Sequence, residues 1–180
     1  MKIENIYLKF LECSCVSTDT RKIEKNSIFF ALKGDNFDAN TFTKEALEKG
    51  AKYVVIDSPK YYIEGKTILV DNVLITLQEI ANHHRRTLKT PIIALTGSNG
   101  KTTTKELINV VLSTKFKTIA TIGNLNNHIG VPLTLLRFNE NTEVGIVEMG
   151  ANHQKEIEFL CQIAEPNYGY ITNFGKAHLE

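Results

Sequence analysis

Short apolar runs alternate with segments of helical periodicity along most of the chain, which predicts an α/β fold with helices packed on a sheet. In the first half, runs rich in β-branched and aromatic residues predict strands over 27–32, 53–56 and 68–70. A helix is expected over 41–49, because apolar residues recur there at helical spacing and Gly50 follows. The first half therefore predicts a small α/β domain.

An amphipathic helix is predicted over 71–89, because apolar residues from Leu74 to Ala81 share one face and Pro91 follows. We place a domain boundary at the end of this helix, which gives domains 1–89 and 90–180. The cationic run at 83–86 lies on its later turns, where positive charge suits the negative end of the helix dipole. We interpret this run as a solvated face.

The alternation of apolar runs with helical segments is clearer after Pro91 and predicts a second sheet. Strands are expected over 92–95, 118–122, 144–147 and 168–172, with helices from 101, over 132–136 and over 154–163. Near-continuous apolar runs such as 92–95 are typical of parallel strands that are covered on both faces. We therefore expect a parallel-sheet domain to follow the N-terminal α/β domain.

Composition excludes several classes of protein. Lys plus Arg number 21 against 20 Asp plus Glu, so a broad electrostatic surface for nucleic acid or an anionic membrane is not expected. No apolar stretch approaches the roughly 18 residues that span a bilayer, and no signal peptide is evident, so we expect a cytoplasmic protein. Cys13, Cys15 and Cys161 lack a Cys-x-x-Cys spacing and are interpreted as reduced thiols.

The strongest chemical signal is a glycine-rich segment between a predicted strand and a predicted helix. It contains Gly97, Ser98, Asn99, Gly100, Lys101, Thr102 and Thr103. Such a turn directs backbone N–H groups at a phosphate, and a lysine and a hydroxyl at its end suit the β- and γ-phosphates and Mg²⁺. It departs from the strict Walker A spacing, because Leu95 stands where the first glycine would fall. We predict an ATP phosphate site with Mg²⁺.

Polar residues that follow other predicted strands are candidates for the same site. Glu148 ends an apolar strand, where it is either a metal ligand or a surface acid, and His178 is either a metal ligand or an unremarkable histidine. Asn126 and Asn127 lie in a glycine-bounded loop and either contact a ligand or cap a turn. Residue types and spacing leave these alternatives open.

Several segments in both halves of the chain resemble segments of the Mur ligase family. The segment 96–103 is similar to the family's variant of the phosphate loop, with a displaced first glycine and Asn before the second. The segments 123–136, 148–157 and 171–180 resemble later parts of its central domain. In the front half, Asp19, Thr20 and Arg21, and the segment 29–34 with Lys33, resemble the UDP-sugar-binding domain. Taken alone, Arg21 and Lys33 are also consistent with plain surface cations.

The resemblance implies an ATP-dependent ligase of peptidoglycan synthesis, closest to the member that adds D-alanyl-D-alanine to UDP-N-acetylmuramoyl-tripeptide. It implies that Lys101, Glu148 and His178 take part in catalysis, that Thr102, Glu148 and His178 hold magnesium, and that Asp19, Thr20, Arg21, Lys33, Asn126 and Asn127 bind substrate. It also implies a monomer whose cofactors are ATP and Mg²⁺, without nucleic-acid or membrane partners.

Two departures from the family's pattern are Asp38–Ala39, where Gly-His is often found, and His128, where an acid is common. The family's carbamylated lysine and its C-terminal domain have no counterpart here, so we expect a fragment without ligase activity of its own. The alternatives are another Mur ligase, a folylpolyglutamate synthetase, a P-loop kinase or GTPase, and a non-catalytic UDP-sugar or nucleotide-binding module.

Overall fold

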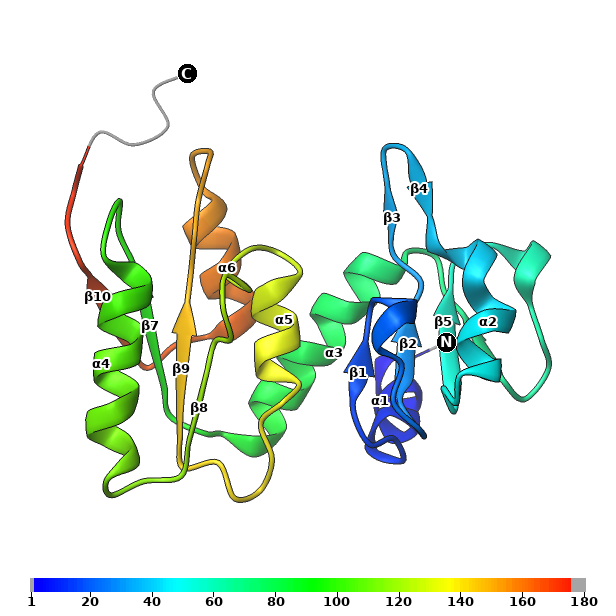
Figure 1. Cartoon of the computed structure of the whole chain (residues 1–180), viewed down its shortest axis with the longest axis horizontal. Coiled ribbons are helices and arrows are strands. Elements are labelled where there is room, and N and C mark those ends of the chain that lie inside the picture. Colours follow the sequence, from blue (N-terminus) through cyan, green and yellow to red (C-terminus); the bar gives the residue numbers. More distant parts are fainter. Residues whose placement is uncertain (1, 176–180) are drawn as a thin grey trace. The chain divides into compact units, whose positions relative to one another are not determined.

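The computed structural model describes residues 2–175, and the chain divides into two compact units, Met1–His83 and His84–Glu180. Each unit contains its own parallel sheet (Figure 1). The helix α3, Val73–Leu88, contributes residues to both units. The domain boundary at Lys89 stays a prediction; this division falls earlier, inside the helix.

The first unit is built on a four-stranded parallel sheet with the order β1-β2-β5-β6. Its strands are Val16–Ser17, Ile28–Phe30, Tyr53–Ile56 and Thr67–Leu69. The helices α1, Ile3–Leu11, and α2, Thr43–Glu48, and the short hairpin of β3, Lys33–Gly34, and β4, Phe37–Asp38, complete it, with 3-10 turns at Thr20–Lys22, Ala39–Phe42 and Pro59–Tyr61. Phe29, Val54 and Ile56 are fully buried in its core, which explains why their strands have few polar residues.

The second unit holds another four-stranded parallel sheet, with the order β10-β7-β9-β8. These strands are Tyr168–Ile171, Ile92–Thr96, Val144–Glu148 and Thr118–Ala120. The helix α4, Lys101–Ser113, packs against β7, β8 and β9, whereas α5, Gly130–Leu135, and α6, Glu156–Ala164, pack against each other and against β9 and β7 respectively. Because the strands are parallel, the loops that follow β7, β8 and β9 meet at one edge (Figure 1).

The α/β class and the parallel sheets predicted from the sequence are confirmed. The structure adds α1, the two-residue strand β1 and the β3–β4 hairpin, which the hydrophobic pattern did not predict. Elements as short as β1 contain too few residues for periodicity to be recognised.

The interpretation of residues 83–86 as a solvated face was wrong for His84 and Arg85, which are 4% and 7% exposed. Arg85 Nε donates to Ala164 O at 3.0 Å, and Arg85 Nη2 donates to Asn167 Oδ1 at 2.9 Å. His84 Nε2 lies 2.9 Å from Phe138 O. Burial of these two side chains is tolerated because hydrogen bonds to partners distant in sequence compensate the free-energy cost of removing the polar groups from water.

Candidate functional site

The predicted phosphate loop connects β7 to α4, and its two glycines have backbone conformations that disfavour other residues. Gly97 has φ +137°, and a Cβ there would lie 2.0 Å from Thr172 Oγ1. Gly100 has φ +76°, precedes α4, and makes no side-chain cap to the helix. Because the first N–H groups of a helix have no acceptor inside it, this uncapped end suits an anion.

Lys101 bends back over the loop. Its Nζ donates to Gly97 O at 2.7 Å, and its side chain also lines a cavity of about 450 Å³. The ammonium therefore lies between the loop and the cavity, where it would attract an anion bound against the loop.

The loop is supported by Asn173, which sequence reasoning did not name as a site residue. Asn173 Oδ1 accepts from the N–H groups of Ser98 and Asn99, each at 3.1 Å. Asn99 O in turn accepts from Thr172 Oγ1 at 2.6 Å and Asn173 Nδ2 at 3.2 Å. The available signal was its position directly after a predicted strand; the strand's place beside β7 was needed to connect it to the loop.

Glu148 ends β9 and faces the start of α4. The residue is 1% exposed, and its Oε1 accepts from Asn126 Nδ2 at 2.8 Å and from Thr102 Oγ1 at 3.4 Å. Its Oε2 is buried and makes no hydrogen bond to the described part of the chain. The alternative of a surface acid is therefore excluded by its burial. The structure brings Thr102, Asn126 and Glu148 together, while His178 lies outside the described residues.

A buried carboxylate oxygen without a donor is a costly arrangement that a cation would relieve. Within residues 2–175, no group of three or more His, Cys, Asp or Glu side chains is placed to hold a metal. One carboxylate with one hydroxyl beside the predicted phosphate loop matches Mg²⁺, which keeps several waters and takes its other ligands from phosphates. Thr102 and Glu148 therefore fit a nucleotide-bound Mg²⁺.

The cavity beside Lys101 extends the site away from the loop. Asn126, Asn127 and His128 line it together with Glu156. Asn127 Oδ1 accepts from the N–H groups of Ile129 and Gly130 at 3.1 and 2.9 Å, so this oxygen is used in starting α5. Hydrogen bonds from the N–H groups of Asn152 and His153 lower the pKa of Glu156 below its ordinary value, which keeps this wall anionic.

A second cavity of about 510 Å³ lies in the first unit. Asp19, Thr20 and Arg21 line it, together with the aromatic rings of Phe37 and Phe42, whose centroids are 5.7 Å apart. Arg21 Nε and Nη2 donate to the Asp19 carboxylate at 2.9 and 2.8 Å, and bonds from the Arg21 side chain and backbone lower the pKa of Asp19 to about 2. The Arg21 side chain is 85% exposed, so its guanidinium is accessible to an anion in solution as well as to Asp19.

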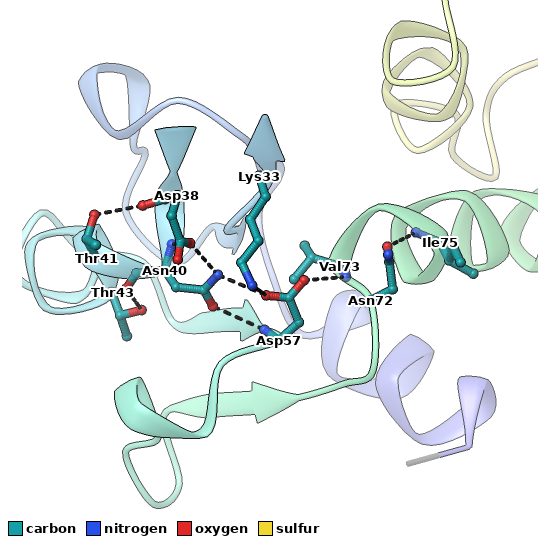
Figure 2. Close-up of polar contacts among 9 residues, drawn as sticks. All are labelled: Lys33, Asp38, Asn40, Thr41, Thr43, Asp57, Asn72, Val73 and Ile75. Carbon is teal, nitrogen blue, oxygen red and sulfur yellow. Dashed lines mark hydrogen bonds and ion pairs between the residues drawn. The ribbon is translucent and has the colours of Figure 1, made fainter. Parts of the chain in front are cut away.

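Lys33 belongs to a different polar cluster, which Figure 2 shows. Its Nζ lies 2.6 Å from Asp57 Oδ1, and the same oxygen accepts from Asn40 Nδ2 at 2.9 Å. Asp57 N donates to Asn40 Oδ1 at 3.1 Å, and Asp57 Oδ2 accepts from Val73 N at 3.4 Å, at the start of α3. The structure does not bring Lys33 to the Arg21 cavity. Sequence reasoning named neither Asn40 nor Asp57.

We expect Asp57→Asn to destabilise the chain by about 1–3 kcal/mol at pH 7, because Lys33 and Asn40 lose a charged partner. Burial raises the pKa of Asp57, but bonds from Lys33 and Asn40 outweigh it and the net shift is downward. A lowered carboxyl pKa stabilises the fold above the unfolded value near 3.9, and this contribution is lost as pH falls through the folded value.

Urea unfolding at pH 7 and at about pH 3 measures this effect, and the difference between wild type and Asp57→Asn should narrow at the lower pH. Glu45→Gln is the matched control, since Glu45 pairs with Lys49 on an exposed helix surface. A difference that is independent of pH would contradict the role assigned to the charged form of Asp57.

The cysteine thiols of both units are free, and burial raises the pKa of each, to about 11 for Cys13. Thiolates are therefore disfavoured at neutral pH. None of the helices in the described part of the chain has the length and hydropathy needed to cross a bilayer.

Comparison with known proteins gives two family matches, which together cover most of the chain. Residues 12–85 match "Mur ligase family, catalytic domain", and residues 95–180 match "Mur ligase middle domain". Among curated proteins, the "UDP-N-acetylmuramoyl-tripeptide--D-alanyl-D-alanine ligase" of Bacillus subtilis is 44% identical over 167 residues, covering 92% of this chain. The Escherichia coli protein of the same name is 39% identical over 165 residues. The chain spans 36% of the length of each.

Solved structures agree with these matches. A crystal structure of MurF from Acinetobacter baumannii has a TM-score of 0.86 and 32% identity, covering 99% of this chain and 42% of that chain. The MurF ligase from Thermotoga maritima, solved in complex with ADP, has a TM-score of 0.82 and 31% identity, covering 95% of this chain and 40% of that chain.

Proposed function

Since this chain belongs to the Mur ligase family, we propose that it forms the UDP-substrate-binding and ATP-binding parts of a UDP-N-acetylmuramoyl-tripeptide:D-alanyl-D-alanine ligase. This choice within the family is supported by the names of its relatives, which are 44% and 39% identical to this chain across about nine-tenths of its length. Because the chain spans about a third of their length, ligation is assigned to the whole protein and two binding steps to this chain.

The observation that carries the ATP-binding role is the pairing of an uncapped helix end with a buried, partly unsatisfied carboxylate. Gly97 to Thr103 would surround the phosphates, with the backbone N–H groups at the start of α4 directed at them, and Lys101 would contact the β- and γ-phosphate oxygens. The ADP complex of the Thermotoga maritima relative supports a nucleotide here.

Thr102 and Glu148 would hold Mg²⁺ beside the phosphates, and His178 remains a predicted further ligand. The cation would neutralise charge on the phosphates during transfer. Glu148 is held in place by Asn126, so this carboxylate does not need to reorganise when the nucleotide arrives.

The reaction proposed for the whole protein is formation of an amide bond through an acyl phosphate. The terminal carboxylate of the tripeptide takes the γ-phosphoryl group, ADP leaves, the amine of D-alanyl-D-alanine attacks the acyl carbon, and phosphate departs. The cavity beside Lys101 combines that ammonium with the side-chain amides of Asn126 and Asn127, and these donors would receive the phosphoryl-accepting carboxylate and offset the anionic Glu156. Lys101 and the loop N–H groups would hold the transferring group in line.

The uridine diphosphate end of the substrate is assigned to the cavity of the first unit. Phe37 and Phe42 offer aromatic surface, and Arg21 offers a charged fork for a phosphate. Thr20 and Asp19 supply polar atoms at the same wall. Lys33 would contact the substrate only if its ion pair with Asp57 opened. We also propose that the whole protein acts as a monomer in the cytoplasm.

An NMR titration with two ligands tests this assignment. UDP-N-acetylmuramoyl-tripeptide is expected to shift backbone signals of Asp19, Thr20 and Arg21, and AMP-PNP with Mg²⁺ those of residues 97–103. The variant Arg21→Ala should lose the first response and keep the second. Shifts confined to the second unit for both ligands would contradict the UDP-substrate assignment.

A further inference from the structure

Lys105 lies on α4, and the phosphate-binding proposal gives it no role. The residue is 0% exposed, its Nζ donates to Thr121 O at 2.7 Å, and Glu106 Oε1 lies 2.9 Å away. An ammonium group is costly to bury unless its protons are bonded, so these acceptors fix the position of the side chain. Most of a lysine's rotamer freedom is lost here, at a further cost in free energy.

Thr121, the residue that Lys105 holds, is bonded directly to β9. Its N–H donates to Ile146 O at 2.9 Å, and its Oγ1 accepts from the N–H of Glu148 at 2.9 Å. The residue is 2% exposed. A single buried threonine therefore connects the ammonium of Lys105 to the backbone of Glu148.

The same helix carries the hydroxyl that faces Glu148. Thr102 precedes Lys105 by three residues, so both side chains lie on one face of α4. Thr102 Oγ1 is 3.4 Å from Glu148 Oε1. The bond from Lys105 to Thr121 thus holds this face of α4 against the end of β9.

We propose that Lys105 is a positioning residue that sets the separation between Thr102 and Glu148, and with it the geometry of the divalent-cation site. The inference rests on the proposed function, since the cation is expected with the nucleotide. Lys105 touches neither, and acts through Thr121.

Two calorimetric titrations of the full chain with AMP-PNP, one in the presence of Mn²⁺ and one in the presence of EDTA, test this role without relying on turnover. For Lys105→Met, the dissociation constant with Mn²⁺ should rise about tenfold, as for one lost charge-assisted bond, and the constant in EDTA by less than about twofold. Lys115→Met, at an exposed lysine of the same unit, is the control for the lost charge and should match wild type.

Thr121 provides a second pair of variants should Lys105→Met fail to fold. Thr121→Val removes the hydroxyl that accepts from Glu148 N–H and should weaken Mn²⁺-dependent binding as well, whereas Thr121→Ser keeps the hydroxyl and should restore it. Equal weakening with and without Mn²⁺, or unchanged binding in Lys105→Met or Thr121→Val, would overturn the positioning role while the proposed function stands. A wild-type chain that binds no nucleotide at all would overturn both.

Discussion

Lys101→Ala is expected to raise the dissociation constant for Mg-ATP about ten- to a hundredfold, because a charge-assisted contact to phosphate contributes about 1.5–3 kcal/mol. The side chain lies over the loop, with its ammonium 2.7 Å from Gly97 O, and removing it leaves the backbone of the loop in place. The loss should therefore appear in nucleotide affinity far more than in the stability of the fold.

Isothermal calorimetry measures the affinity, and thermal unfolding of the same samples measures stability. Lys115→Ala removes an exposed lysine of the same unit and is expected to bind Mg-ATP as wild type does. Equal affinity in Lys101→Ala and wild type would remove Lys101 from the proposed site.

Gly97→Ala is expected to abolish measurable nucleotide binding and to destabilise the second unit by about 2 kcal/mol or more, from backbone strain together with steric overlap. The new Cβ would lie 2.0 Å from Thr172 Oγ1 and 3.1 Å from Asn173 N, at a φ of +137°. Thr172 and Asn173 hold Asn99 in place, so relief of the overlap would displace the residues that support the loop.

Gly169→Ala is the matched control, because this glycine lies on the strand beside β7 and a Cβ there has no neighbour within 4 Å. Thermal unfolding should separate the two alanine variants clearly, and calorimetry should detect Mg-ATP binding only in Gly169→Ala. Similar stability and affinity in both would show that the contact between the loop and the end of β10 is unimportant.

The parts of the fold that the sequence predicts are those with repeated local patterns. The strand at Ile92–Thr96 and the helix from Lys101 were recognisable because apolar periodicity and a glycine-rich turn occur within a few residues. Glu148 was predicted as a candidate from its place after an apolar strand, and the structure places it beside Thr102. Parallel strand pairing explains this, since it puts both chain segments at the same edge.

The rest depends on contacts between residues that are far apart in the chain. Arg85 is buried because acceptors near residue 165 reach its guanidinium, and no pattern within α3 reports them. Asn173 supports a loop more than seventy residues earlier, as the separations of its hydrogen bonds show. Lys105 has the sequence of an ordinary helix-surface lysine, and its burial follows only from the packing of α4 on β8 and β9.

We propose that the second unit binds ATP phosphates at Gly97–Thr103 with a divalent cation between Thr102 and Glu148. A crystal structure of the chain grown with AMP-PNP and Mn²⁺ tests it most directly, since the anomalous signal of manganese locates the cation. We expect a single strong peak within about 2.0–2.3 Å of Thr102 Oγ1 and in contact with the Glu148 carboxylate directly or through one water, with the phosphates against the N–H groups at the start of α4. A nucleotide whose phosphates lie elsewhere, or manganese away from both residues, would contradict it.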